Sequence, residues 1–447
     1  MTRVQLAVWL IAVAIGPTPL PVANSTKSFW IDSPGANPLA KVGSTGPLTH
    51  SADVCVIGSG ISGMSAAYNL ASEPGLNVAV FEARDFCRNG GHLTPYLFQG
   101  FEKIALEYGA EQAKVGFELE QYTARTLVKL IQDEGIADAV DFIHGGHTCV
   151  LMSEVALNRR KGDFKAAATA GTNLSSVKWL TEGEMHEKYG TPHPGFTFDA
   201  YNLWPLKLVT QFYHIAKRHL EASSGSLSLH TNTPVVQVLP SGDKWELVTP
   251  RGSTTCKYVL HATNAYAGHL LRSMSGEVGI VPTRGQVVAV RSRNTGMSSW
   301  TDTTGEYWFP RPGGGETPLI ILGGGGHVSG VVDDSVVEQN KHDFLVKFLP
   351  RVFDAPEYEP EMEWVPALSD GIMGYTSVGD PFVGPLEPLE GSSFKGQYIS
   401  AGFSGHGMPR TFASVQAAVE MILADLHEEE WKQPEWLPDR FLTRNRM

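Results

Sequence analysis

Three glycines near the start of the chain have the types and spacing that could hold a diphosphate. Gly58, Gly60 and Gly63 form a Gly-x-Gly-x-x-Gly pattern that directly follows the apolar run 54–57. In a strand–turn–helix unit the first glycine permits a tight turn, the second lets the backbone approach a pyrophosphate, and the third lets the helix pack closely on the sheet. The N–H groups and partial positive charge of a helix N-terminus suit the same anion. The pattern therefore predicts a nucleotide-binding turn.

The elements around these glycines agree with this prediction. The small-residue segment 64–70 follows Gly63 and predicts a helix, and a second apolar run ends at Glu82. A carboxylate about 20 residues beyond the glycines can accept hydrogen bonds from ribose hydroxyls. A glycine pattern alone arises by chance in Gly-rich turns, but strand, turn, helix, strand and acid in register are far more specific. They predict a Rossmann-type dinucleotide unit.

Length and composition bound the class of protein. With 447 residues the chain exceeds one compact core, so two domains, or one core with an inserted domain, are expected. The 42% hydrophobic and 18% charged residues are ordinary for a soluble globular protein. A net charge of −12 without any basic run argues against nucleic acid as a partner.

The N-terminus predicts secretion. Residues 1–23 begin with a positive charge, continue with an apolar stretch too short to span a bilayer, and end on the small residue Ala23. An uncleaved anchor or an apolar leader is the alternative, because Pro21 occupies the third position before a cut after Ala23. We expect no stable membrane span in the mature chain. The Asn-x-Ser/Thr sequons at Asn24 and Asn173 would be usable in a secreted protein.

Cysteine and histidine spacing indicates no metal site. Cys55 lies in the first predicted strand, where a buried thiol is expected, and the positions of the four cysteines assign no disulfide. His144 and His147 flank two glycines and are expected to be loop residues rather than metal ligands. The other cysteines are Cys87, Cys149 and Cys256.

The remaining chain predicts a mixture of helices and short strands. Residues 24–50 are rich in Pro, Gly, Ser and Asn and predict an extended leader. Helical periodicity is present between 110 and 135 and again from about 409 to 426. Strands are predicted at 227–230, 235–239, 245–248, 258–261, 286–291, 319–322 and 397–401.

Further motifs are shared with a known family. They are Glu82-Ala-Arg84, Arg88-Asn-Gly-Gly-His92, Pro282-Thr-Arg-Gly-Gln286, Gly374-Tyr-Thr376, Pro381-Phe-Val-Gly384 and Gly402-Phe-Ser-Gly-His-Gly-Met408. With these motifs the sequence resembles the FAD-dependent oxidoreductases of the D-amino-acid oxidase superfamily. The branch it resembles contains glycine, sarcosine and glutamylputrescine oxidases, in the form common in fungi, and the resemblance runs from about residue 28 to 426.

The resemblance implies the fold class and domain organisation. It implies an α/β protein with a discontinuous Rossmann-type FAD-binding domain and an antiparallel-sheet cap domain that binds substrate. The FAD-binding domain would comprise 51–125, 205–275 and 365–427, and the cap 126–204 and 276–364. Residues 1–23 would be the signal peptide, 24–50 the extended leader and 428–447 a C-terminal tail.

The resemblance also implies FAD as the cofactor. The residues that would hold it are Gly58, Ser59, Gly60, Ile61, Ser62, Gly63, Glu82, Ala83, Arg84, Arg88, Asn89, Gly90, Gly91, Val235, Gly402, Phe403, Ser404, Gly405, Gly407 and Met408. The backbone of Val235 would hold the adenine. The turn 402–408 would meet the pyrimidine end of the flavin, where N–H groups and the dipole of the following helix stabilise negative charge.

Candidate catalytic residues follow from the same resemblance. They are His92, His406 and Tyr307. We expect His92 to pack on the flavin without a covalent bond and His406 to shape its turn. Further candidates for the substrate cap, which would suit an anionic or aromatic substrate, are Trp308, Arg311, Tyr201 and Trp204.

Two departures from the family pattern bear on function. About five residues are missing between Glu82-Ala-Arg84 and Arg88, where the family has a loop around the pyrophosphate, and the segment 366–370 looks inserted. The predicted function is oxidation of an amine, amino acid or related small molecule by hydride transfer to flavin, with dioxygen as acceptor. One alternative is a tailoring oxidase of fungal secondary-metabolite biosynthesis. The other, suggested by the short loop, is a non-catalytic, flavin-poor binding protein.

Overall fold

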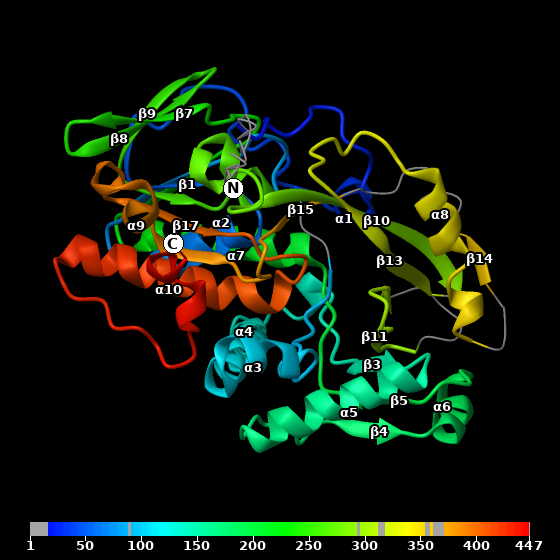
Figure 1. Ribbon diagram of the computed structural model, residues 1–447. Helices are drawn as coiled ribbons and strands as arrows, with labels where there is room; N and C mark the ends of the chain where they lie inside the picture. The colour runs from blue at the N-terminus through cyan, green and yellow to red at the C-terminus, as the bar shows by residue number, and fades with distance from the viewer. Residues whose placement is uncertain are drawn as a thin grey trace, which may run out of the picture.

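Two β-sheets with helices packed against them form the protein (Figure 1). The computed structural model describes residues 17–87, 91–292, 296–311, 318–353, 358–360 and 371–446. The predicted α/β fold, with a Rossmann-type domain and a second sheet as cap, is confirmed.

The first sheet is the Rossmann-type unit. In spatial order its strands are β16 (Phe382–Pro385), β17 (Gln397–Ala401), β9 (Gly252–His261), β1 (Ser51–Ile57), β2 (Asn77–Phe81) and β6 (Ser226–His230), with β7 (Gln237–Ser241) and β8 (Lys244–Thr249) joined beside β9. Strands β17, β9, β1, β2 and β6 run parallel, and β16 pairs antiparallel with β17. Residues 54–57 of β1 are buried, as a central strand covered on both faces requires.

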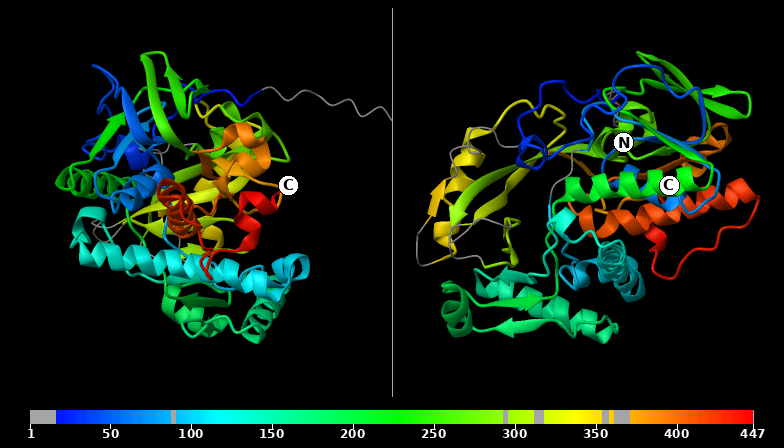
Figure 2. Two further views of the ribbon diagram at one scale, coloured as in Figure 1. Left: turned by 90° about the vertical axis from the view of Figure 1, so that its left-hand side faces the viewer. Right: turned by 180° about the vertical axis from the view of Figure 1, so that it is seen from behind.

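Four helices pack around this sheet. They are α2 (Ile61–Leu70), α4 (Ala110–Asp133), α7 (Pro205–Ala222) and α10 (Met408–His427). Helix α2 contacts both α7 and α10, and α10 contacts α4. In the left view of Figure 2, α4 is seen lengthwise beneath α10. Among the residues described, no helix combines the length and apolar character needed to cross a membrane.

The second sheet forms the cap. In spatial order its strands are β14 (Tyr358–Pro360), β10 (Val281–Ser292), β13 (Leu319–Ser329), β12 (Tyr307–Pro310), β11 (Ser299–Thr301), β3 (His147–Val150), β5 (Gly195–Phe198) and β4 (Lys178–Leu180), and β15 (Gly371–Tyr375) pairs with β10. All pairs are antiparallel except β11 with β3. The other helices are α1 (Phe29–Asp32), α3 (Phe101–Tyr108), α5 (Glu154–Thr169), α6 (Glu182–Tyr189), α8 (Gln339–Val346) and α9 (Glu387–Glu390).

The prediction of a buried thiol at Cys55 is wrong. Cys55 forms a disulfide with Cys256, which lies 201 residues further along the chain. The parallel pairing of β1 with β9 brings the two cysteines together. Sequence spacing contains no sign of this pairing.

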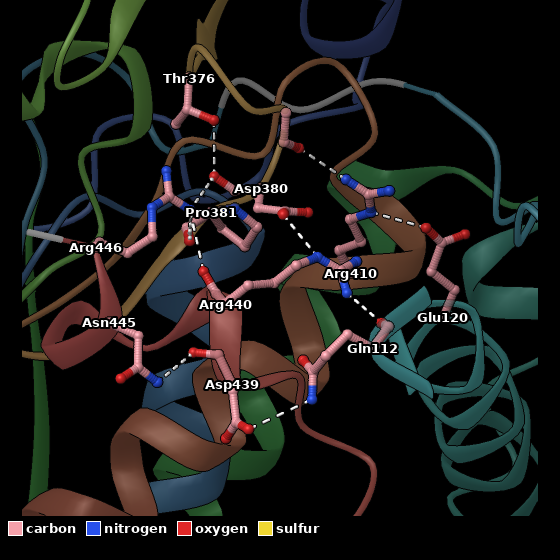
Figure 3. Close-up of polar contacts among 11 residues, drawn as sticks. Gln112, Glu120, Thr376, Asp380, Pro381, Arg410, Asp439, Arg440, Asn445 and Arg446 are labelled. Atoms are coloured by element: carbon pink, nitrogen blue, oxygen red, sulfur yellow. Dashed lines mark hydrogen bonds and ion pairs between the residues drawn. The ribbon is translucent and has the colours of Figure 1, made fainter. Parts of the chain in front are cut away.

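Both terminal segments pack against the Rossmann-type unit. In the leader, the carbonyl of Ala40 accepts a hydrogen bond from Phe86 N (3.3 Å), and Asn37 Nδ2 donates to the carbonyl of Phe86 (2.7 Å), so the leader lies along the short loop before Arg88. In the C-terminal segment, Arg440 Nε donates to Asp380 Oδ2 (2.7 Å) (Figure 3).

Candidate active site

A cavity of about 950 Å³ runs along the interface of the two sheets. Its lining combines the turn after β1, the end of β2, the turn before α10 and the cap strands β10, β12, β13 and β15. The nucleotide-binding turn and the C-terminal glycine turn therefore open onto one space, although about 340 residues separate them in the sequence.

The three glycines have the geometry that the pattern predicts. Gly58 has φ +111°, and a Cβ there would lie 2.5 Å from the carbonyl oxygen of Ala262. Gly63 packs so closely that a Cβ would lie 1.9 Å from the Gly58 oxygen. A Cβ at Gly60, the N-cap of α2, would meet no protein atom within 4 Å. Gly60 thus leaves open the space that a diphosphate would need.

Glu82 is held at the edge of the cavity by backbone and side-chain donors. Its Oε2 accepts hydrogen bonds from Ser59 N (3.0 Å) and Ser59 Oγ (2.8 Å), and its Oε1 accepts one from Arg84 N (2.9 Å). Ser59 is fully buried and lies behind the cavity lining, where it orients Glu82. The predicted residues on the lining here are Gly58, Gly60, Ile61, Ser62, Glu82, Ala83 and Arg84, and Val235 lines the same cavity.

The C-terminal glycine turn is anchored by Asn264. Asn264 Oδ1 accepts hydrogen bonds from Gly402 N (3.0 Å) and Phe403 N (3.4 Å). Gly402 does not line the cavity, whereas residues 403–408 do. The N-terminus of α10, which begins at Met408, therefore faces the cavity with its positive dipole end.

His406 belongs to a buried polar cluster centred on Glu120 of α4. Glu120 Oε2 lies 2.9 Å from His406 Nε2, and Glu120 Oε1 accepts a hydrogen bond from Arg410 Nε (2.8 Å). Figure 3 shows the contact between Glu120 and Arg410. The Tyr96 ring stacks on the His406 ring, with centroids 3.7 Å apart. Burial opposes ionisation of Glu120, but the charges of His406 and Arg410 outweigh it and lower its pKa to about 2.

His92 begins a chain of buried hydrogen bonds. Its Nδ1 lies 2.6 Å from Thr94 Oγ1, which lies 3.2 Å from Ser299 Oγ, which in turn lies 2.8 Å from His147 Nδ1. His147 Nε2 is bonded to Thr301 Oγ1 at 2.9 Å. Burial, aided by the charge of His406, lowers the pKa of His92 to about 3, so its imidazole is neutral near pH 7. The prediction that His147 is a loop residue is wrong, because His147 is buried and is the first residue of β3.

Tyr307 lines the cap side of the cavity near His92, with ring centroids 5.7 Å apart. A Cβ on Gly323 would lie 2.4 Å from the Tyr307 hydroxyl oxygen, so this glycine makes room for the phenol. Burial raises the pKa of Tyr307 to about 12, which keeps the phenol protonated.

Arg311 is not available to bind an anionic substrate. It does not line the cavity, and its Nη2 donates to Asp141 Oδ2 (2.8 Å) while its guanidinium lies over the rings of Trp30 (5.0 Å) and Trp204 (4.8 Å). Trp308 is fully buried in the cap core. Neither Tyr201 nor Trp204 lies on the cavity lining.

Gly91 and His92 line the cavity, but the neighbouring predicted residues Arg88, Asn89 and Gly90 lie outside the described residues. The segment 366–370 also lies outside them. Among the described residues, no group of three or more His, Cys, Asp or Glu side chains could hold a metal ion.

Several site residues carry no motif that the sequence reveals. Asn264, Tyr96, Asp302 and Glu306 line the cavity, and Glu120 lies behind the lining. Glu120 gave one usable signal, because an acidic residue stands among the apolar positions of a strongly periodic helix.

The chain belongs to the FAD dependent oxidoreductase (DAO) family, whose model matches residues 53–421. It is 25% identical over 202 residues to a glycine oxidase of Pseudomonas aeruginosa, covering 45% of this chain and half of the relative's length. It is 23% identical over 403 residues to a probable oxidoreductase OrdL of Haemophilus influenzae, covering 85% of each chain. The crystal structure of a glycine oxidase from Geobacillus kaustophilus has the same fold, with a TM-score of 0.66, 19% identity, and coverage of 88% of this chain and 98% of that one.

The residues present fit the family's cofactor, FAD. The open space at Gly60 and the carboxylate of Glu82 suit the diphosphate and ribose. Thr263 Oγ1 lines the same cavity and is a buried polar atom without a hydrogen-bond partner among the described residues. The turn 403–408 and residues 91–92 would lie against the flavin ring. The protein is therefore an FAD-dependent oxidoreductase of the DAO family.

Proposed function

We propose that this protein oxidises the C–N bond of a small amine or amino acid and passes the electrons to dioxygen. The carbon next to nitrogen would lose a hydride, the nitrogen would become an imine that water hydrolyses, and dioxygen would take up the two electrons and leave as hydrogen peroxide. Bound FAD supplies the two-electron acceptor for this chemistry. The observation that carries the proposal is the single cavity shared by the nucleotide turn and the turn before α10.

His92 and His406 are weak bases, which fits a substrate whose reacting nitrogen is already neutral when it binds. The His92 imidazole is neutral near pH 7, and burial also lowers the pKa of His406, although Glu120 partly opposes this effect. The N-terminus of α10 favours negative charge developing beside it. These groups would exclude water, orient the substrate and stabilise charge rather than act as strong bases.

The proposal is tested with the purified protein. We expect yellow protein with stoichiometric FAD, bleaching of the flavin band under anaerobic conditions by at least one amine or amino acid, and peroxide release when air is admitted. Colourless protein that FAD titration does not alter would instead support the flavin-poor binding protein. Bleaching without peroxide release would contradict dioxygen as the acceptor. The alternative role in fungal secondary metabolism stays a prediction from the sequence.

We also propose that the protein enters the secretory pathway. The disulfide between Cys55 and Cys256 supports an oxidising compartment, and the sequon residues Asn24 and Asn173 are exposed. A cut after Ala23 would remove Thr18. The mature protein would then lack the hydrogen bond that Thr18 N donates to the Gly268 carbonyl (3.2 Å).

We expect the secreted protein to carry glycan at Asn173. Treatment with peptide N-glycosidase should lower its mass and convert this residue to aspartate, while the Asn173→Gln variant should lack that modification. Mass spectrometry of the N-terminal peptide identifies the cut. Protein retained inside the cell and unmodified at both sequons would overturn the proposal.

A further inference from the structure

Among the described residues, the arginines that line the cavity are already neutralised. Each forms an ion pair with a buried carboxylate that lies behind the lining. The pairs are Arg84 with Asp334 (3.0 Å), Arg160 with Asp163 (3.1 Å) and Arg410 with Glu120 (2.8 Å). A substrate carboxylate would therefore have to compete with a resident partner for each of these guanidinium groups.

Four of the described histidines line the cavity: His92, His269, His327 and His406. His269 Nδ1 lies 2.9 Å from the Thr18 carbonyl oxygen. The other three do not supply positive charge. Burial lowers the pKa of His92 to about 3 and also lowers those of His327 and His406. These imidazoles are neutral near pH 7. Lys103 lines the cavity from an exposed position on α3, where its charge is screened by solvent.

Within the described part of the chain, two buried carboxylates on the cap side form no ion pair with a cation. Asp302 and Glu306 both line the cavity, and each is only 5% exposed. Asp302 Oδ1 accepts hydrogen bonds from three backbone N–H groups of residues 304–306, and Glu306 Oε1 accepts one from Gly325 N (3.2 Å). Among the described residues no lysine, arginine or histidine forms an ion pair with either carboxylate.

The hydrogen-bond donors around the two carboxylates are too few. Thr304 Oγ1 contacts both Asp302 Oδ2 and Glu306 Oε2. A hydroxyl carries one hydrogen and can donate it to only one of the two acceptors. The other acceptor has room for a donor from a ligand.

Gln286 adds a second, independent sign that a polar ligand binds here. It lies on β10 opposite Gly324 of β13. A Cβ on Gly324 would lie 2.9 Å from Cα and Cγ of Glu306, so Gly324 lies between Gln286 and Glu306. Gln286 lines the cavity and is 3% exposed. Its Oε1 accepts a hydrogen bond from Glu338 N (3.2 Å), but its Nε2 has no partner among the described residues. This buried donor needs an acceptor from the ligand.

We infer that the substrate is an amine that carries a second, positively charged group and no carboxylate. This inference rests on the proposed function. The reacting nitrogen must be neutral, because only a nitrogen lone pair can stabilise the positive charge left by hydride loss. The cation beside Asp302 and Glu306 is therefore a different group of the same molecule. Gln286 Nε2 would donate to an uncharged nitrogen or oxygen of the same molecule.

Three probes with four carbon atoms each test this substrate class. They are 1,4-diaminobutane, butylamine and 4-aminobutanoate, which share the reacting amine and end in an ammonium, a methyl and a carboxylate group. Their affinities for the FAD-loaded protein are measured anaerobically from the perturbation of the flavin absorption band. We expect the diamine to bind at least about tenfold more tightly than the amino acid, with butylamine between them.

The carboxylate variants identify the source of this preference. Glu306→Gln should reduce the preference for the diamine about tenfold, and Asp302→Asn is a second variant should the first not fold. Glu187→Gln, which removes one negative charge from an exposed position on α6, should leave the preference unchanged. Equal or tighter binding of 4-aminobutanoate, no measurable binding of any probe, or an unchanged preference in both cavity variants would overturn the inference. If the protein binds FAD but gives any of these results, the inference on substrate class fails and the proposed function stands. If the protein binds no FAD, both the inference and the proposed function fail.

Discussion

The Gly60→Val variant should fold but lose its FAD. A side chain at this position meets no protein atom within 4 Å, and the backbone angles of Gly60 (φ −68°, ψ −171°) are open to other residues. The valine would instead fill the space where the backbone approaches the diphosphate. We expect FAD affinity to fall about a hundredfold, equivalent to about 3 kcal/mol. The ratio of flavin to protein absorbance measures the loss, and circular dichroism measures the retained fold.

Gly63→Val is the matched comparison, because it changes the same residue type in the same turn. Its Cβ would lie 1.9 Å from the Gly58 carbonyl oxygen, so helix α2 would have to move off the sheet. We expect this variant to lose folded protein whether or not FAD is added. Stoichiometric FAD in Gly60→Val would refute the assignment of this turn to the diphosphate.

The sequence predicts those parts of the fold whose signal is local. The strand, glycine turn and acid at 54–82 appear as β1, α2 and β2, and the periodic segment at 110–135 appears as α4. Strand boundaries shift by a few residues where the burial pattern is weak, as at β7. The predicted boundary between domains at 125 and 126 falls inside α4, and β15 joins the cap sheet.

The sequence is less informative where distant segments meet. Pairing of Cys55 with Cys256 depends on the order of strands in the sheet, which spacing does not encode. Arg311 has the residue type of a carboxylate-binding group, but its neighbour in space is Asp141, 170 residues away in the chain. The charge balance of the cavity likewise depends on the carboxylates behind each arginine. These pairings become visible only in three dimensions.

Replacement of Glu120 by glutamine should destabilise the protein more than most single substitutions. Glu120 is fully buried, and its carboxylate compensates the charge of buried Arg410 while it also accepts a hydrogen bond from Tyr96 N (2.5 Å). Glutamine retains the shape but leaves the guanidinium charge unpaired. We expect the free energy of unfolding to fall by about 3–5 kcal/mol, measured by urea titration of the FAD-free protein. Glu118→Gln is the control, since this half-exposed residue of the same helix pairs with Lys114 at 3.8 Å and should change stability by less than about 0.5 kcal/mol.

The effect of this substitution should depend on pH in a defined direction. The pKa of Glu120 is about 2 in the folded protein against 4.5 for the ordinary carboxyl group, so the stability it provides is fully present above about pH 4.5. As the pH falls from 4.5 towards 2, the unfolded chain takes up a proton that the folded chain does not, and this stability is lost. The difference between wild type and Glu120→Gln should therefore shrink through that window, while the difference for Glu118→Gln stays near zero. A gap that stays constant from pH 7 to pH 3 would mean that Glu120 acts through packing and hydrogen bonds rather than through its charge.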